Sequence, residues 1–110
     1  MLDIRLYMAQ RLSALLMVPL VLGHIAVMIY AVQDGLTAQE ILNRTRGSLA
    51  WAMFYGLFVL AASIHGAIGV RVVTHEWLGA SGRTLSNITW LTWLVLFALG
   101  AQAVVAVTLT

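Results

Sequence analysis

Residues 61–77, AASIHGAIGVRVVTHEW, place a histidine in the middle of an apolar run. No charged residue occurs from Gly47 to Val70, and at about 1.5 Å per residue such a helix can cross the hydrocarbon core of a bilayer. An ionisable side chain inside a membrane helix costs free energy unless it has a use. The segment therefore predicts a transmembrane helix in which His65 is a candidate functional residue.

The residues around His65 are suited to a large, flat ligand. Gly66 and Gly69 remove side-chain bulk beside the imidazole, and a neutral imidazole nitrogen is a good axial ligand for haem iron. Arg71 follows about 9 Å further along the helix, where its guanidinium could pair with a haem propionate. The alternative needs no cofactor, because Ala62-x-x-x-Gly66 also fits close packing of membrane helices and a buried histidine can bond across a helix pair.

Composition indicates one integral membrane domain. The 110 residues are 62% hydrophobic and 9% charged, which leaves more apolar surface than a soluble domain of this size can cover. The charges lie at helix ends rather than in a patch, so nucleic acid is not expected as a partner. Because the chain has no Cys, any metal must be held by His or come with a partner.

Three charge-free stretches predict an all-α membrane protein with three transmembrane helices. The spans are expected at about residues 12–33, 48–73 and 87–110, within a single domain covering 1–110. Residues 1–10 are mixed in polarity and predict a short interfacial helix before the first span. Pro19 is expected to kink that span. Residues 37–40, TAQE, form a capping-box pattern and predict a short surface helix after it.

The distribution of arginine predicts the orientation in the membrane. The excess lies on the N-terminal side, with Arg5, Arg11, Arg71 and Arg83 there and only Arg44 and Arg46 on the other side. By the positive-inside rule, the N-terminus is expected in the cytoplasm.

A second histidine, His24, lies in the middle of the first span. Two intramembrane imidazoles favour a ligand role for both. By helical rise from the inner ends of the predicted spans, His24 is about 18 Å deep and His65 about 13 Å. The two could serve two haems at different depths or line one haem together. The alternative for His24 is a hydrogen bond to a carbonyl freed near Pro19.

Polar and aromatic side chains gather at the inner interface and form a candidate quinone site. Their donors would hold the quinone oxygens and a titratable group would pass protons; the residues are Arg11, Ser13, His75, Glu76 and Trp77. The alternative is that Arg and Trp at these positions are ordinary interface anchors.

Residues 63–71, SIHGAIGVR, closing with Glu76-Trp77, resemble the second span of the cytochrome b membrane-anchor subunits of succinate dehydrogenase and fumarate reductase. In that family the pattern is His, then Gly four residues on, often Arg two later, and then an acid followed by an aromatic. Arg11-Leu12-Ser13 is similar to the Arg–Ser element that opens the family's first span. The resemblance covers essentially the whole chain and implies half of a haem-binding helical bundle.

The resemblance also implies roles for single residues. His65 takes the place of the axial haem ligand and Arg71 that of a propionate partner, while Arg11 and Ser13 correspond to quinone-site positions. Glu76 and Trp77 stand where the family usually has Asp and Tyr, so an indole replaces a phenol beside the quinone. Leu22-Gly23-His24 resembles the first-span histidine of the two-haem branch, which serves the haem further from the cytoplasm.

The partners implied by the resemblance are a flavoprotein subunit, an iron–sulfur subunit on the cytoplasmic side, and a second anchor chain or another copy of this one. One or two b-type haems would be shared with that partner chain. Two haems would require an assembly, because the two histidines of one chain cannot supply four imidazoles. The expected role is electron relay between the iron–sulfur subunit and quinone in the bacterial inner membrane, as a non-catalytic subunit of a succinate:quinone oxidoreductase-type enzyme of the tricarboxylic acid cycle.

Two other functions fit the same residues. One is a haem-free structural anchor with a quinone site only. The other is a small proton-coupled transporter or channel subunit with His24, His65 and Gln102 as a polar path.

Overall fold

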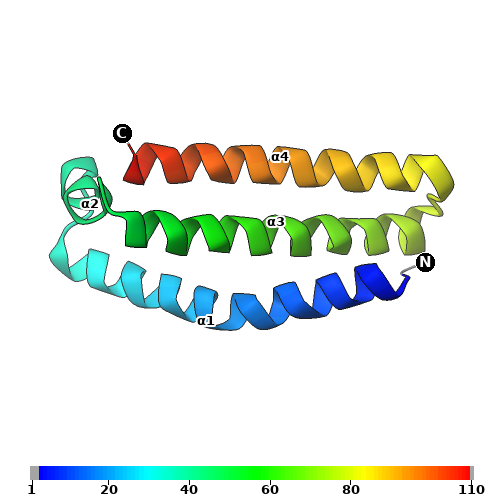
Figure 1. Cartoon of the computed structure of the whole chain (residues 1–110), viewed down its shortest axis with the longest axis horizontal. Coiled ribbons are helices and arrows are strands. Elements are labelled where there is room, and N and C mark those ends of the chain that lie inside the picture. The colour runs from blue at the N-terminus through cyan, green and yellow to red at the C-terminus, as the bar shows by residue number, and fades with distance from the viewer. Residues whose placement is uncertain (1–2, 110) are drawn as a thin grey trace.

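The computed structural model describes residues 3–109 as a bundle of long helices (Figure 1). In chain order the elements are α1 (Ile4–Asp34), α2 (Ala38–Thr45), α3 (Leu49–Leu78) and α4 (Gly82–Thr108), and no strand occurs within residues 3–109. Helices α1, α3 and α4 run side by side, and the short α2 lies at the end of the bundle where α1 connects to α3. The all-α prediction is confirmed.

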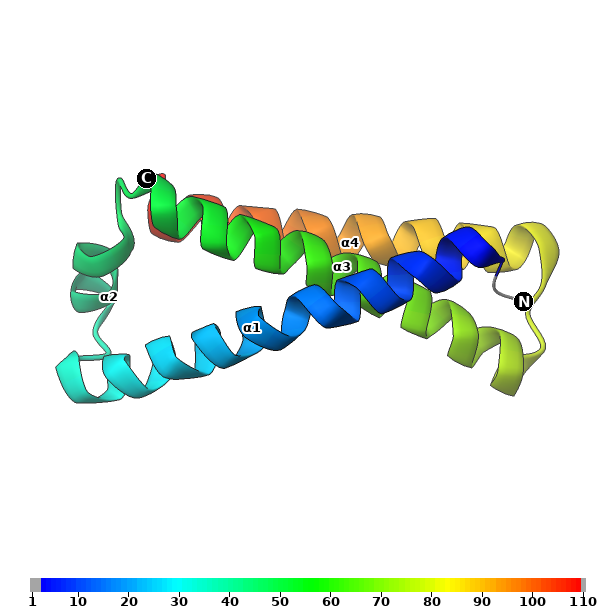
Figure 2. The same ribbon diagram turned by 60° about the horizontal axis from the view of Figure 1, so that its bottom comes forward.

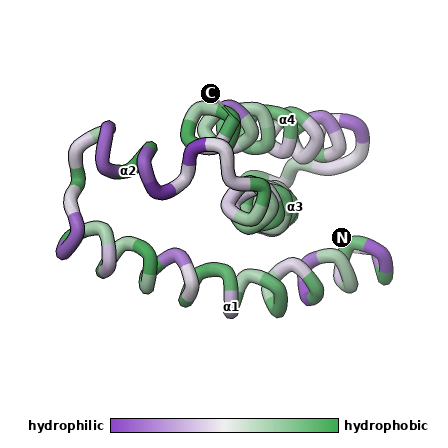
Figure 3. Tube along the Cα trace, turned by 60° about the vertical axis from the view of Figure 1, so that its left-hand side comes forward, coloured by the Kyte–Doolittle hydropathy of each residue, from purple (hydrophilic) through white to green (hydrophobic). Residues whose placement is uncertain are grey.

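Helices α1, α3 and α4 are each long and apolar enough to cross a membrane. Each is about 40 Å long or longer by helical rise, which exceeds a hydrocarbon core of about 30 Å. Large apolar side chains such as Leu15, Leu22 and Leu99 are exposed on their outer faces, as expected where lipid replaces water. Figure 3 shows apolar residues along most of all three helices. The chain is therefore a multi-pass membrane protein with three spans.

The N-terminal segment is part of α1 rather than a separate helix. Asp3 caps α1, because its Oδ1 accepts a hydrogen bond of 2.9 Å from the backbone N–H of Leu6. From Ile4 the helix continues without interruption to Asp34, so the prediction of a separate interfacial helix is wrong. The polar residues at its start do not break a helix that has a cap and no proline before Pro19. Residues 1–2 and 110 of the predicted segments lie outside the described part of the chain.

Helix α1 is bowed (Figure 1) and crosses over α3 (Figure 2). Pro19 lies inside α1, where its ring removes one backbone donor and favours bending. The second span also extends beyond its predicted end. Helix α3 continues to Leu78 and ends because Gly79 adopts a left-handed conformation with φ of 70°, a common way to terminate a helix.

Helix α3 is the centre of the bundle, since it packs against both α4 and α1. Its buried side chains are small or apolar: Ala61, Ser63, Ala67 and Ile68. Gly66 faces α4, and a Cβ there would lie 3.1 Å from Leu96 Cδ1. Gly66 therefore serves close helix packing, and the prediction that it makes room beside the imidazole is wrong. At Gly69 the nearest atom to an added Cβ is Gln10 Nε2, at 4.0 Å.

The short helix α2 lies at one end of the bundle, where hydrogen bonds hold both of its own ends. The predicted capping box is confirmed: Glu40 N–H donates to Thr37 Oγ1 (3.2 Å), and Thr37 N–H donates to the Glu40 carboxylate (3.0 Å). At the other end of α2, Thr45 Oγ1 donates to the carbonyl of Val107 on α4 at 2.6 Å. The arrangement fixes α2 across the bundle end.

Candidate functional site

His65 lies where α1 packs against α3. Its Nδ1 is 3.5 Å from Ser13 Oγ on α1. The Ser13 hydroxyl donates a hydrogen bond to the carbonyl of Gln10 at 3.0 Å. Ser13 is buried, with 7% of its surface exposed. The imidazole of the second span is therefore held against the first span, and within residues 3–109 its Nε2 has no hydrogen-bond partner.

A groove of about 380 Å³ lies beside His65. Its other lining residues are apolar and come from α1: Ala14, Met17, Val18, Val21 and Leu22. Two of them, Val18 and Leu22, are exposed at 58% and 63%, so one wall of the groove is also the outer surface of the chain. A ligand seated here would contact this chain on one side and remain open to a neighbouring chain on the other.

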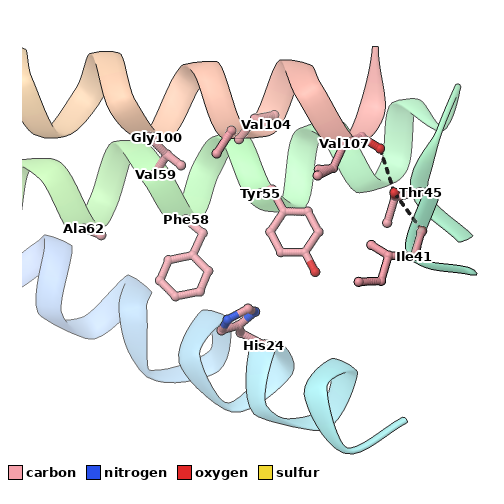
Figure 4. Close-up of a pocket in the computed structure, with 11 residues that line it drawn as sticks. His24, Ile41, Thr45, Tyr55, Phe58, Val59, Ala62, Gly100, Val104 and Val107 are labelled. Carbon is pink, nitrogen blue, oxygen red and sulfur yellow. Dashed lines mark hydrogen bonds between the residues drawn. The ribbon is translucent and has the colours of Figure 1, made fainter. Parts of the chain in front are cut away.

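His24 faces a different groove, of about 370 Å³, between α1, α3, α4 and α2 (Figure 4). Its ring packs edge-on against Phe58 and Tyr55, with ring centroids 5.3 and 6.0 Å away. Its Nδ1 is buried and has no hydrogen-bond partner within residues 3–109. His24 Nδ1 therefore does not make the hydrogen bond to a carbonyl near Pro19 that was the alternative for this residue.

The two imidazoles lie at clearly different depths. His65 is level with Ser13, and His24 follows Ser13 by about 16 Å along α1. On α3, Phe58, which contacts His24, precedes His65 by roughly 10 Å. The predicted depth difference of about 5 Å was too small, because α1 and α3 extend past the ends from which it was measured. Since two axial nitrogens must flank one iron within a few ångströms, His24 and His65 of one chain cannot share a haem.

Arg71 points toward α4 rather than α1. Its Nη1 donates to Thr89 Oγ1 at 3.2 Å, and its Nε is buried and has no hydrogen-bond partner among residues 3–109. On a helix, positions 65 and 71 are separated by about 120° around the axis, which explains why Arg71 and His65 contact different helices. The guanidinium is a positive charge whose Nε donor is buried and has no hydrogen-bond partner within residues 3–109, as a propionate partner requires, but it lies on a different face of α3 from His65.

The quinone-site candidates are spread over the end of the bundle that holds the N-terminus and the α3–α4 connection. Trp77 is 80% exposed, Glu76 is exposed, and Arg11 is exposed with its guanidinium 5.8 Å from the ring centroid of Tyr7. His75 Nδ1 lies 2.8 Å from the carbonyl of Ala80. Ser13 is buried against His65 instead. The structure thus separates Ser13 from the exposed candidates.

Gln102 does not join the two histidines. It is exposed on α4, while the groove at His24 is lined on that helix by Gly100, Ala103, Val104 and Val107. With His24 and His65 in separate grooves as well, the three residues of the predicted polar path are not brought together.

The donor set suits a porphyrin-borne metal better than a free ion. Within residues 3–109, no three side chains of His, Asp or Glu gather as a metal site. An imidazole with an unpartnered nitrogen beside an apolar groove instead matches axial ligation, in which the porphyrin fills the equatorial positions of the iron. The residues at His65 therefore fit haem with one ligand from this chain.

These features define a multi-pass helical membrane protein with imidazoles held inside its spans. The family model described as succinate dehydrogenase/fumarate reductase transmembrane subunit matches residues 2–108, and the chain belongs to this family. The predicted resemblance is confirmed. No curated protein and no solved structure matches the chain. The short name of this family refers to a cytochrome, which implies haem among the cofactors of the family. A transmembrane subunit of these enzymes implies flavoprotein and iron–sulfur partners.

Three residues of the site were not found from the sequence. Gln10 accepts the Ser13 hydroxyl, Thr89 accepts from Arg71, and Phe58 packs on His24. The Gln10 contact could have been inferred, because a serine inside a helix commonly bonds a carbonyl three or four residues earlier. The other two depend on the register between helices, which no single-helix pattern contains.

Proposed function

We propose that the chain ligates b-type haem through His65 and helps to pass electrons between a docked iron–sulfur subunit and membrane quinone. The observation that carries the proposal is the His65 imidazole, held by Ser13 between two spans and bordered by an apolar groove. Bound haem would supply a one-electron carrier inside the bilayer. Met17 and Val21 would exclude water from the ligand, and the half-buried Arg71 guanidinium would supply positive charge for a propionate.

A second protein ligand at the level of His65 would come from a partner chain. His24 is more than about 10 Å away along the bundle, and the groove at His65 has an exposed wall at Val18 and Leu22. A second anchor chain or another copy of this one would cover that wall and complete the haem site. If His24 also ligates, it serves a separate haem, so an assembly holds one or two.

The quinone headgroup would bind at the end of the bundle that carries Arg11, Glu76 and Trp77. All three are exposed. A side chain must be accessible if it is to contact a substrate at the interface with a docked subunit. Arg11 would donate to a quinone oxygen, and Glu76 or His75 would pass protons. The arginine distribution supports a cytoplasmic location for this end, in a bacterial inner membrane.

A reduced-minus-oxidised absorbance spectrum of the purified complex tests the proposal. The wild-type complex should show a b-type Soret signal, and His65→Ala should lose it. Ser63→Ala is the matched control, because Ser63 is buried in the same helix and its hydroxyl donates to the carbonyl of Leu60 in that helix. Full haem content in His65→Ala would overturn the assignment.

Two other outcomes separate the alternative functions. A wild-type complex with no Soret signal would favour a haem-free anchor with a quinone site only. Purification without any flavin or iron–sulfur protein would favour a transporter subunit, for which the separation of His24, His65 and Gln102 gives no support.

A further inference from the structure

The hydroxyl of Ser13 has two polar neighbours, which differ in whether they can donate a hydrogen bond. The carbonyl oxygen of Gln10, at 3.0 Å, can only accept a hydrogen bond. The single hydroxyl proton of Ser13 therefore goes to Gln10, and the Oγ atom offers only lone pairs to its other neighbour. That neighbour is His65 Nδ1, at 3.5 Å. For this contact to be a hydrogen bond, Nδ1 must carry the proton.

We propose that Ser13 is a positioning residue that holds His65 in the Nδ1–H tautomer and leaves the lone pair on Nε2. The nitrogen that binds a metal is set by the hydrogen bond that the other nitrogen makes. The tautomer follows from the Gln10–Ser13–His65 arrangement alone. Its consequence, that Nε2 is the haem-ligating atom, rests on the proposed function.

The surroundings of Ser13 allow it to select the tautomer of His65 although the contact between Oγ and Nδ1 is long. At 3.5 Å the contact is longer than an ordinary N–H···O hydrogen bond of about 2.7–3.2 Å, so it adds little stability. Ser13 is only 7% exposed, however, and lies between two transmembrane helices, where little water competes for Nδ1. In the part of the chain that the structure describes, no other group bonds the imidazole. A weak bond without competitors is sufficient to select one of two tautomers.

Nitrogen-15 NMR of the full chain in lipid, without haem, tests the tautomer directly. His65 should show a protonated Nδ1 and an unprotonated Nε2, and Ser13→Ala should give a mixture of both tautomers. Ser13→Thr, which keeps a hydroxyl, should restore the wild-type spectrum. A proton on Nε2 in the wild type, or the same tautomer in Ser13→Ala, would overturn the proposal. Ser63→Ala is the control, because Ser63 is a buried serine of the same helix as His65 whose hydroxyl donates to the carbonyl of Leu60 and not to this arrangement.

The assembled complex tests the consequence. If Ser13 orients the ligand, Ser13→Ala should weaken haem retention by roughly 10-fold, the lower end for loss of a partner behind a metal ligand, and Ser13→Thr should recover it. A change in KM for quinone with haem retention unaltered would overturn the positioning role and return Ser13 to the quinone site. A complex without haem, together with the Nδ1–H tautomer in the isolated chain, would refute the proposed function while the tautomer assignment stands.

Discussion

Gly100 on α4 lies directly against Val59 on α3, so closely that an added Cβ would overlap both methyl groups of the valine. The contact brings the two backbones together beside the groove that His24 lines (Figure 4). We expect Gly100→Ala to destabilise the folded chain by about 1–3 kcal/mol, because overpacking forces helices apart or side chains off their rotamers. Steric-trapping measurements of the free energy of unfolding in bicelles would check this value.

Two further variants show whether the overlap is the cause. Val59→Ala removes the methyl groups that meet the new Cβ, so the double variant should recover part of the loss. Gly56→Ala is the matched control, since a Cβ there meets nothing within 4 Å. A loss in Gly100→Ala that Val59→Ala leaves unchanged would contradict the packing explanation.

The hydroxyl of Thr45 joins α2 to the last turn of α4 through Val107. We expect Thr45→Val to cost about 1 kcal/mol, the usual net value of a hydrogen bond. Amide hydrogen exchange in residues 41–45 should become roughly 5-fold faster, because that loss lowers the free energy of local opening of α2 and so raises the population of the open state. Thr92→Val is the control, since the Thr92 hydroxyl donates to the carbonyl of Ile88 within its own helix. Unchanged exchange in α2 would show that α4 does not hold it.

The sequence predicted features that depend on one helix at a time. Charge-free runs gave three spans, and TAQE gave the α2 cap, because hydropathy and capping act over a few neighbouring residues. It did not predict which helix each side chain faces. Gly66 and Arg71 both turned out to contact α4, whereas His65 contacts α1. Such choices depend on the register and crossing of helices, which are set by packing among residues far apart in the chain.

The Glu40 carboxylate provides a pH test of the α2 cap. Its hydrogen bond from the backbone N–H of Thr37, and then that from the Thr37 hydroxyl, lower the pKa of Glu40 below its ordinary value of 4.5. Because the folded pKa is depressed, the stabilisation is present above about pH 4.5 and is lost as the pH falls through the lower folded pKa. Carbon-13 NMR of the side-chain carboxyl should show the depressed value.

Thr37→Ala removes one of the two hydrogen bonds to Glu40 and should raise its pKa part of the way back. The backbone donor remains, so the return should be incomplete. Titration of wild-type Glu40 at or above 4.5 would contradict the cap geometry.

His24 and His65 lie at different depths and line separate grooves, which makes their haem signals separable. We expect His24→Ala in the purified complex to leave the haem signal that depends on His65 intact. The variant should remove a second signal only if the complex contains a haem at the level of Phe58 and Tyr55. Haem-to-flavin ratios with redox-titrated absorbance spectra would measure both. Ile25→Ala is a control for altered packing of α1, because Ile25 is exposed beside His24 and lines neither the His24 groove nor the His65 groove. Loss of every haem signal in His24→Ala, with the folded complex retained, would mean that the two imidazoles act on one haem and would contradict their separation.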